Sequence, residues 1–236
     1  MRQVPMYGII GAGHMARHFI HYLQLLSIPF QQWSRAENNV SDLDHLIQSC
    51  NPILILINDD AIELFITDHP HLKEKTLLHF SGALYTKLAV GAHPLMTFAD
   101  DLYALNQYQK IPFILDNNEL KFSQLMPGIP NPHHTISPEM KHYYHCMCSM
   151  SGNFTSLLWQ KMFEEMTDKF NIPHEMIHPY LEQICQNLLR NQAGSLTGPF
   201  VRNDKKTISK HLDALTNDKF LSVYQGFLAS YFNSDI

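Results

Sequence analysis

A short glycine-rich turn near the start of the chain constrains the fold more than any other stretch. The apolar run Met6–Ile10 leads into the sequence GAGHMA at positions 11–16, and a helical pattern follows over His14–Leu26. A strand that passes through GxGxxA directly into a helix is typical of the first unit of a dinucleotide-binding α/β sheet. In such a unit the two glycines allow a tight turn and a close backbone approach to a pyrophosphate, and the alanine allows close helix packing. We expect the following residues to bind the nucleotide: Gly11, Gly13, His14, Met15 and Ala16.

The first half of the chain alternates short apolar runs with helical patterns. The runs that we expect to be strands are Met6–Ile10, Ile28–Trp33, Ile53–Ile57, Thr76–Phe80, Leu88–Ala92 and Ile111–Leu115. Helical patterns follow the first three runs, over His14–Leu26, Ser41–Ser49 and Asp59–Thr67. Ser41 with Asp44 three residues later resembles a capping box. Strands that alternate with helices predict βαβ units, and therefore an α/β fold with a Rossmann-like, doubly wound, mostly parallel sheet.

The pattern changes at the proline-rich stretch 126–132, which is typical of a linker. From Pro138 onward we find no strand pattern, and an all-helical region is expected. Its predicted helices are Glu139–Phe170, His174–Gln192, Lys205–Leu215 and Asp218–Phe232. We therefore predict two domains, a nucleotide-binding domain over residues 1–130 and a helical substrate or dimerisation domain over residues 138–236.

Composition excludes several classes of protein. The chain has 236 residues, 45% of them hydrophobic, and a formal net charge of −5, which argues against a surface for nucleic acid. Four cysteines in a chain of this length do not form a disulfide framework and favour a reducing compartment. No apolar stretch approaches the roughly 18 residues of a membrane span, and glycines interrupt any signal-peptide pattern at the start. We expect a soluble cytoplasmic protein with a small-molecule partner.

The end of the second predicted strand indicates which dinucleotide binds. An NAD site usually carries Asp or Glu about 20 residues after the glycine loop, where the carboxylate binds the ribose 2′-hydroxyl. Here Ser34 and Arg35 occupy that place, and Arg35 lies 22 residues after Gly13. A guanidinium group can bind a 2′-phosphate through two hydrogen bonds, and Ser34 can donate another. The sequence therefore predicts NADP, although Arg35 could also be an ordinary solvated loop residue.

Polar residues follow the later strands, at the edge of the sheet where ligands bind in open α/β folds. Asn58 follows the third apolar run and Ser81 the fourth, and we expect both beside the nicotinamide. His93, at the end of the fifth run, is the best candidate for the catalytic acid or base because imidazole titrates near neutrality. A purely structural role for His93, such as hydrogen bonding that fixes the loop, is equally compatible with its position.

The 15 histidines raise the question of a metal site. His142 and His145 have helical spacing, with Cys146 and Cys148 beside them. However, no spacing matches a structural zinc pattern, and the four residues do not share one helix face. We expect no bound metal, and Cys146 is better explained as a packing residue.

Three stretches together resemble a group of bacterial Rossmann-like oxidoreductases whose C-terminal half is a domain of unknown function. These stretches are 8–16 with 34–35, 79–84 with 91–98, and 196–204. The group is distantly similar to pyrroline-5-carboxylate reductase, ketopantoate reductase and the 6-phosphogluconate dehydrogenase superfamily. The resemblance implies an NADP-binding domain, a helical domain that often dimerises, and a substrate cleft between the two. It also implies that Asn153, in the first long helix, faces the cofactor.

Two positions depart from the pattern of that group. In the better-studied relatives a lysine four residues before the helical asparagine supplies the acid, but this chain has Ser149 there. The familiar form of the stretch 196–204 has glycine where this chain has Asn203. From the same stretch we expect three residues to bind substrate, namely Thr197, Arg202 and Asp204.

The charged residues of that stretch allow two interpretations. Arg202 could hold a substrate carboxylate or phosphate while Asp204 orients it, or the two could form an ion pair at a domain junction. Arg190 is a weaker candidate for anion binding. Large apolar residues in the helical region suggest an interface in a homodimer, although they could simply be core. They are Trp159, Phe163, Tyr224, Phe227, Tyr231 and Phe232.

These observations leave two hypotheses for function. In the first, the protein is an NADP-dependent oxidoreductase that transfers a hydride between nicotinamide and a small carbonyl or imine substrate near Ser81, His93 and Asn153. In the second, it is a non-catalytic NADP-binding regulatory or scaffold protein. The absence of the lysine and of any close acid–base pair in the sequence motivates the second hypothesis.

Overall fold

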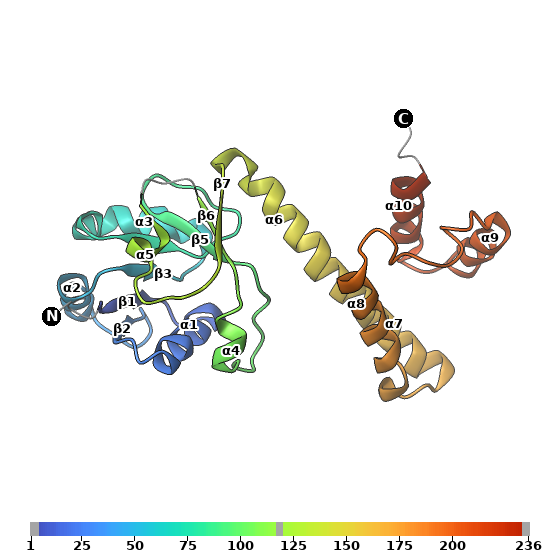
Figure 1. Ribbon diagram of the computed structural model, residues 1–236, viewed down its shortest axis with the longest axis horizontal. Helices are drawn as coiled ribbons and strands as arrows, with labels where there is room; N and C mark the ends of the chain where they lie inside the picture. The colour runs from blue at the N-terminus through green and yellow to red at the C-terminus, as the bar shows by residue number, and fades with distance from the viewer. Residues whose placement is uncertain (1–4, 117–119, 233–236) are drawn as a thin grey trace. The chain divides into compact units, whose positions relative to one another are not determined.

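The computed structural model describes residues 5–116 and 120–232, and the chain divides into two compact units, Met1–Leu157 and Leu158–Ile236. The first unit contains a seven-stranded sheet with the order β2-β1-β3-β4-β5-β6-β7 (Figure 1). Its strands are β1 (Tyr7–Ile10), β2 (Phe30–Trp33), β3 (Ile53–Ile55), β4 (Leu77–His79), β5 (Val90–Pro94), β6 (Phe113–Asp116) and β7 (His133–Ile136). The six expected strands are all present, and the Rossmann-like α/β fold is confirmed.

The direction of the strands changes between β5 and β6. Strands β1 to β5 are parallel, whereas β6 pairs antiparallel with β5, with Ala92 opposite Leu115. The seventh strand, β7, pairs parallel with β6 and was not expected from the sequence. Three of its four residues are exposed, so it has no apolar alternation that would reveal it. Backbone pairing at the edge of the sheet, rather than side-chain burial, defines this strand.

The helices of the first unit connect and cover the sheet. They are α1 (His14–Leu25), α2 (Val40–Ser49), α3 (Asp59–Asp68), α4 (Leu105–Tyr108), α5 (Phe122–Leu125) and α6 (Lys141–Ser149). The expected capping box at Ser41 is wrong by two residues. The side chain of Asn39 accepts from the backbone N–H of Asp42 at 3.0 Å, and the Asp42 carboxylate accepts from the N–H of Asn39. Asn39 is therefore the N-cap of α2, and Ser41 only donates to its side chain.

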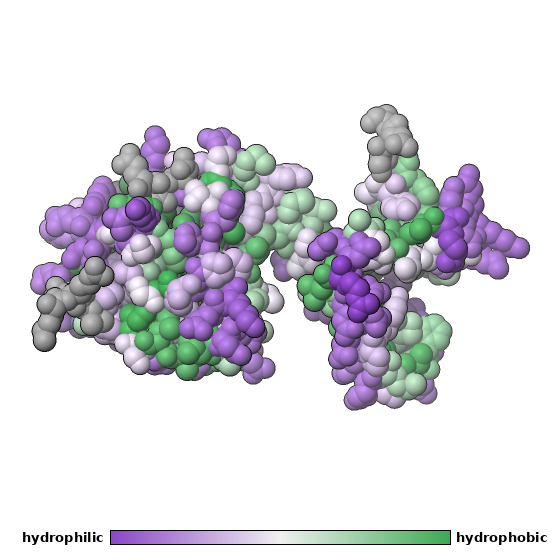
Figure 2. Space-filling view, in the orientation of Figure 1, coloured by the Kyte–Doolittle hydropathy of each residue, from purple (hydrophilic) through white to green (hydrophobic). Residues whose placement is uncertain are grey.

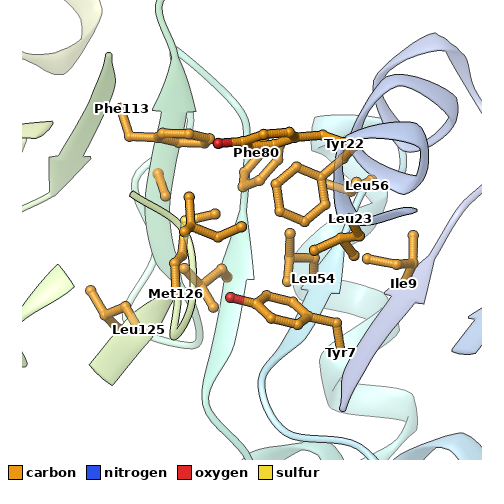
Figure 3. Packing of buried hydrophobic residues seen from close by; sticks show 14 of the residues in the cluster. Tyr7, Ile9, Tyr22, Leu23, Leu54, Leu56, Phe80, Phe113, Leu125 and Met126 are labelled. Atoms are coloured by element: carbon orange, nitrogen blue, oxygen red, sulfur yellow. The ribbon is translucent and has the colours of Figure 1, made fainter. Parts of the chain in front are cut away.

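Alternate residues along each strand pack into two hydrophobic clusters on opposite faces of the sheet, as the two-residue period of a strand requires. Ile9 and Leu54 belong to the cluster shown in Figure 3, which α1 covers. Ile10 and Ile55 belong to the other cluster, which contains residues of α2 and α3. All four side chains are fully buried. Burial of this kind stabilises a fold by roughly 1.5–3 kcal/mol for each large aliphatic side chain.

A long helical stretch follows β7, as the sequence predicts. After a short turn at Pro138–Met140, α6 continues through a π-helical turn at Met150–Phe154 into α7 (Thr155–Phe170). The remaining helices are α8 (His178–Arg190), α9 (Lys205–Ala214) and α10 (Leu221–Phe232). Within the described ranges, no helix has both the length and the apolar character needed to cross a membrane.

The second unit buries few apolar side chains. Among its described residues only the side chains of Ile177 and Ile208 are buried, with 4% and 8% of their surface exposed. Of its aromatic residues, Phe227 is 50% exposed, and Tyr231 and Phe232 are 39% and 40% exposed. The other three, Trp159, Phe163 and Tyr224, are partly buried. Figure 2 shows hydrophobic surface on α10 and near α7 and α8.

Candidate nucleotide and active site

The glycine loop has the backbone conformation that the sequence motif requires. Gly11 lies between β1 and α1 with φ of +129°, and a Cβ there would lie 2.2 Å from the carbonyl oxygen of Leu56. Only glycine fits this position. Gly13 is the N-cap of α1, makes no side-chain cap hydrogen bond, and has open space where a Cβ would lie. The first-turn N–H groups of a helix have no partner within the helix, so this open end can receive an anion.

The residues after Gly13 have different surroundings. Ala16 is fully buried and allows close packing of α1 on the sheet, and Met15 is half-buried against the same core. His14 is exposed, and its Nε2 lies 2.9 Å from Oδ1 of Asp100. The guanidinium group of Arg17 also donates a hydrogen bond to the backbone carbonyl oxygen of Asp100. Asp100 therefore connects the loop after β5 to the N-terminal turn of α1.

The end of β2 holds a buried hydroxyl beside an exposed arginine. Ser34 is buried, and its N–H donates to Oδ1 of Asn38 at 2.9 Å. The Ser34 hydroxyl finds no hydrogen-bond partner in the described part of the chain. Arg35 is exposed at the following position. A buried hydroxyl without a partner costs free energy, so the observation is compatible with an outside hydrogen-bond acceptor at this place.

Asn58 and Ser81 lie after β3 and β4, as expected. Asn58 is the exposed N-cap of α3, and its side chain makes no cap hydrogen bond. The Ser81 hydroxyl donates to Oδ2 of Asp59 at 2.5 Å and accepts from the N–H groups of Ala83 and Leu84 at 3.2 and 2.8 Å. The hydroxyl therefore organises the turn after β4, whereas the Asn58 amide remains available to a ligand.

His93 lies near the carboxyl end of β5 and is half-buried. Its Nδ1 is 2.7 Å from the hydroxyl oxygen of Tyr144 in α6. Burial first, and then the neighbouring His145 and Lys141, lower the pKa of His93 to about 4. The imidazole is consequently neutral near pH 7, so it can accept a proton or orient a neighbour but does not carry a proton to donate as imidazolium.

A buried ion pair lies on the same sheet, closer to its amino edge. Nζ of Lys141, at the start of α6, lies 2.8 Å from Oδ1 and 3.0 Å from Oδ2 of Asp116, at the end of β6. The two side chains are 2% and 4% exposed. Asp116 also accepts from the N–H of Gly91 in β5. Burial lowers the pKa of Lys141 and the Asp116 carboxylate opposes this shift. Nothing in the local sequence distinguishes this lysine from an exposed one.

His79 is fully buried next to this pair. Its Nδ1 accepts from the N–H of Ser81 at 3.3 Å, and its Nε2 has no partner among the described residues. Burial, and then the charge of Lys141, lower the pKa of His79 to about 3. His79 is therefore a neutral residue that supports the loop after β4.

The π-helical turn contains Asn153. This side chain is exposed within the first unit, four residues after Ser149. A π turn is rare and often occurs at functional sites. Within residues 5–116 and 120–232, no three His, Cys, Asp or Glu side chains are grouped closely enough to hold a metal ion. Cys146 instead contacts the sulfur of Met150 at 3.9 Å.

The three residues expected to bind substrate lie in the second unit. Thr197 and Arg202 are exposed. Asp204 is the N-cap of α9, accepting from the N–H of Thr207 at 3.0 Å and from its hydroxyl at 2.7 Å. These bonds, and to a smaller extent Arg202, lower the pKa of Asp204. Asn203 has φ of +50°, a left-handed conformation that asparagine tolerates, which explains why the resembling group can have glycine there.

The comparison with family models matches residues 116–230 to a domain of unknown function, DUF2520. Solved structures match nearly the whole chain. A candidate NADP oxidoreductase from Bacteroides fragilis is 18% identical with a TM-score of 0.74, covering 97% of this chain and 98% of its own. A protein from Thermotoga maritima is 20% identical with a TM-score of 0.70, covering 96% and 97%.

A third structure is the pyrroline carboxylate reductase of Plasmodium falciparum with NADP bound. It is 14% identical with a TM-score of 0.58 and covers 96% of each chain. The comparison with curated proteins finds no match for this sequence. The expected likeness to pyrroline-5-carboxylate reductase and to a domain of unknown function is confirmed. The chain thus has the fold of these Rossmann-type proteins with helical C-terminal regions, and its residues 116–230 match DUF2520.

Proposed function

We propose that the protein is an NADP-dependent oxidoreductase that transfers a hydride between nicotinamide and a small carbonyl or imine substrate. The observation that carries the proposal is the glycine loop, where Gly11 must lack a side chain and Gly13 leaves the start of α1 open. Structures of the same fold support it. The Bacteroides fragilis protein is described as an NADP oxidoreductase, the Plasmodium falciparum reductase has NADP bound, and a reductive aminase from Aspergillus terreus is in complex with NADPH.

The residues present fit this cofactor. The N-terminal turn of α1 would hold the pyrophosphate, and Arg35 with the unpartnered hydroxyl of Ser34 would hold the 2′-phosphate. Asn58 and the turn organised by Ser81 would lie beside the nicotinamide. Asn153 and His93 would contact the nicotinamide and the substrate. When bound, NADPH would supply the hydride, and these side chains would orient the substrate and exclude water.

Titration with NADPH and NADH tests the assignment of Arg35. A charge-assisted hydrogen bond contributes about 1.5–3 kcal/mol, so Arg35→Ala should weaken NADPH binding by about 10- to 100-fold. NADH affinity should stay within about threefold, which makes NADH the internal control. Lys210→Ala, which removes an exposed cation of α9 in the second unit, should change neither affinity. A wild-type protein that binds NADH at least as tightly as NADPH would contradict the choice of cofactor.

We also propose roles for the two regions expected from the sequence. Residues 1–130 bind the nucleotide, and residues 138–236 supply substrate contacts through Thr197 and Arg202. Asp204 caps the start of α9, directly after Arg202, and so holds this segment in place. The affinity for small carboxylates, measured for the wild type and for Arg202→Ala, tests the role of Arg202. If Arg202→Ala binds them as the wild type does, Arg202 is not a substrate ligand.

A homodimer is the third part of the proposal. The second unit has 79 residues but only two buried apolar side chains among those described, which is too little core for a stable helical unit. The exposed apolar residues of α10 would pack against a second copy, and Figure 2 shows that hydrophobic surface. Light scattering at micromolar concentration tests this, and a monomer mass would contradict it.

A non-catalytic NADP-binding protein is the second candidate. It is favoured by Ser149 in place of the lysine of the better-studied relatives and by the Ser81 hydroxyl, whose hydrogen bonds are all made within the protein. Oxidation of NADPH with a panel of keto acids and cyclic imines separates the two candidates, since binding without turnover would favour the second.

We place the protein in the cytoplasm, because all four cysteines are free.

A further inference from the structure

The helix α6 places its side chains along β5 in the direction of the carboxyl edge. Lys141, in its first turn, contacts Asp116, whose carboxylate also binds the N–H of Gly91. Tyr144, one turn later, contacts His93, which lies two residues beyond Gly91 in β5. The helix α6 therefore runs in the same direction as β5, and Tyr144 lies near the carboxyl edge, where open α/β sheets bind ligands.

The contact between Tyr144 and His93 is close and specific. The hydroxyl oxygen lies 2.7 Å from Nδ1, and the two rings meet edge to face with centroids 5.6 Å apart. The ring of His145 also meets the imidazole edge to face, with centroids 5.9 Å apart. Gly82 makes room for both histidines, because a Cβ there would lie 2.3 Å from Cδ2 of His145 and 3.1 Å from Nε2 of His93. Thus Nδ1 is directed to Tyr144 and Nε2 to the turn after β4.

The charge states of this group favour tyrosine over histidine as the residue that holds a transferable proton. The groups facing His93 are Tyr144, His145 and Lys141, and burial with the last two lowers its pKa. Burial first, and then Cys148 one turn along α6, raise the pKa of Tyr144. Near pH 7 the imidazole is therefore uncharged, and the phenol retains its hydrogen.

We propose that Tyr144 is the proton donor of the reaction, with His93 as its positioning residue; this rests on the function proposed above. As the hydride adds to the carbon of a carbonyl or imine, the electron pair of the double bond moves to the oxygen or nitrogen. That atom takes the phenolic proton as the O–H bond of Tyr144 breaks. Solvent water then returns a proton to the phenolate. The sum is substrate plus NADPH plus one proton giving the reduced product and NADP.

Tyr144→Phe tests the assignment, with NADPH and two probes, the cyclic imine 2-methyl-1-pyrroline and the ketone cyclohexanone. General acid catalysis contributes about 10²–10⁴-fold, so kcat should fall at least about 100-fold. KM and the affinity for NADPH should stay within about threefold, because the phenyl ring still fills the site. Tyr143→Phe is the matched control, since this neighbouring tyrosine is 61% exposed, and its kcat should equal that of the wild type.

Two substitutions of His93 test positioning. His93 positions Tyr144 through its Nδ1–H, which donates to the phenol oxygen and leaves the phenolic hydrogen for the substrate. In His93→Asn the amide N–H can lie near the place of Nδ1 and donate to the same oxygen, so most of the activity should remain. In His93→Leu no donor remains, so kcat should approach that of Tyr144→Phe while KM changes little. Equal activity of the two variants would overturn the positioning role. Thermal melting of each variant shows whether the fold is retained.

The outcomes separate this assignment from the proposed function. If the wild type reduces a probe and Tyr144→Phe keeps kcat within threefold, Tyr144 is not the donor and the oxidoreductase proposal stands. If the wild type binds NADPH but reduces neither probe, the assignment is overturned and the non-catalytic candidate is favoured. If the wild type does not bind NADPH at submillimolar concentration, both are overturned.

Discussion

The buried pair of Lys141 and Asp116 should make a large contribution to stability that depends on both partners. In Lys141→Met the side chain keeps its length and loses its charge, which leaves the carboxylate of Asp116 in a site where it is 4% exposed. Removing one partner of a buried pair costs about 3–5 kcal/mol, because a buried charge stays uncompensated. Asp116→Asn should cost a similar amount, since it leaves the ammonium group alone. We expect Lys141→Met with Asp116→Asn to be less destabilised than the sum of the two.

The cost of Asp116→Asn should also depend on pH. Burial lowers the pKa of Lys141 and the Asp116 carboxylate opposes this shift, so the shift should be larger in the variant. Above the lowered pKa the folded variant binds fewer protons than the unfolded chain, so its stability rises as the pH increases from 7 toward about 10. In the wild type the shift is smaller, so the difference between the two proteins should shrink over that range.

Denaturant unfolding followed by fluorescence measures this difference. The chain has two tryptophans, Trp33 in the first unit and Trp159 in the second. In a Trp159→Phe background the signal comes from Trp33, which is 9% exposed and packs in the core of the first unit. A loss below about 1 kcal/mol at pH 7, or a loss that does not change with pH, would refute the reasoning.

Three further results are expected. Gly11→Ala should abolish NADPH binding and destabilise the first unit, because a Cβ would lie 2.2 Å from the carbonyl oxygen of Leu56; calorimetric titration and melting measure both, and normal binding would contradict the loop geometry. Asp100→Asn should tighten NADPH binding a few-fold at low salt by removing a negative charge beside His14, with the gain disappearing at high salt as the charges are screened. Asp204→Ala should cost about 1 kcal/mol through loss of the N-cap of α9, and an unchanged melting temperature would argue against the cap.

The sequence predicts those parts of the fold that depend on local patterns. The apolar runs at Tyr7–Ile10 and Ile53–Ile55 identify buried strands, and the glycine loop indicates where α1 begins. The edge strand β7 is different, because its exposed residues carry no hydrophobic period and its backbone pairing with β6 is set by tertiary structure. The capping box at Asn39 is missed because Ser41 with Asp44 offers the same spacing two residues later.

The candidate site divides in the same way. Gly13 and Arg35 are recognisable because their roles depend on their spacing along the chain. The neighbours of His93 are not recognisable, because Tyr144 is 51 residues away and meets it only through the packing of α6. The pair of Lys141 and Asp116 cannot be recognised from the sequence for the same reason, since lysine and aspartate are usually exposed to solvent.

The reversal of β6 and β7 has a consequence for how the protein can vary. Because β7 ends at the amino edge, the turn at Pro138–Met140 sets the starting height of α6 on the sheet. A helix advances 1.5 Å and turns 100° with each residue. One residue gained or lost in that turn would therefore move Lys141 from Asp116 and Tyr144 from His93 in a single step. Mutations at the edge remote from the ligand are thus coupled to the geometry of the site, and the length of this turn should tolerate less change than the surface loops.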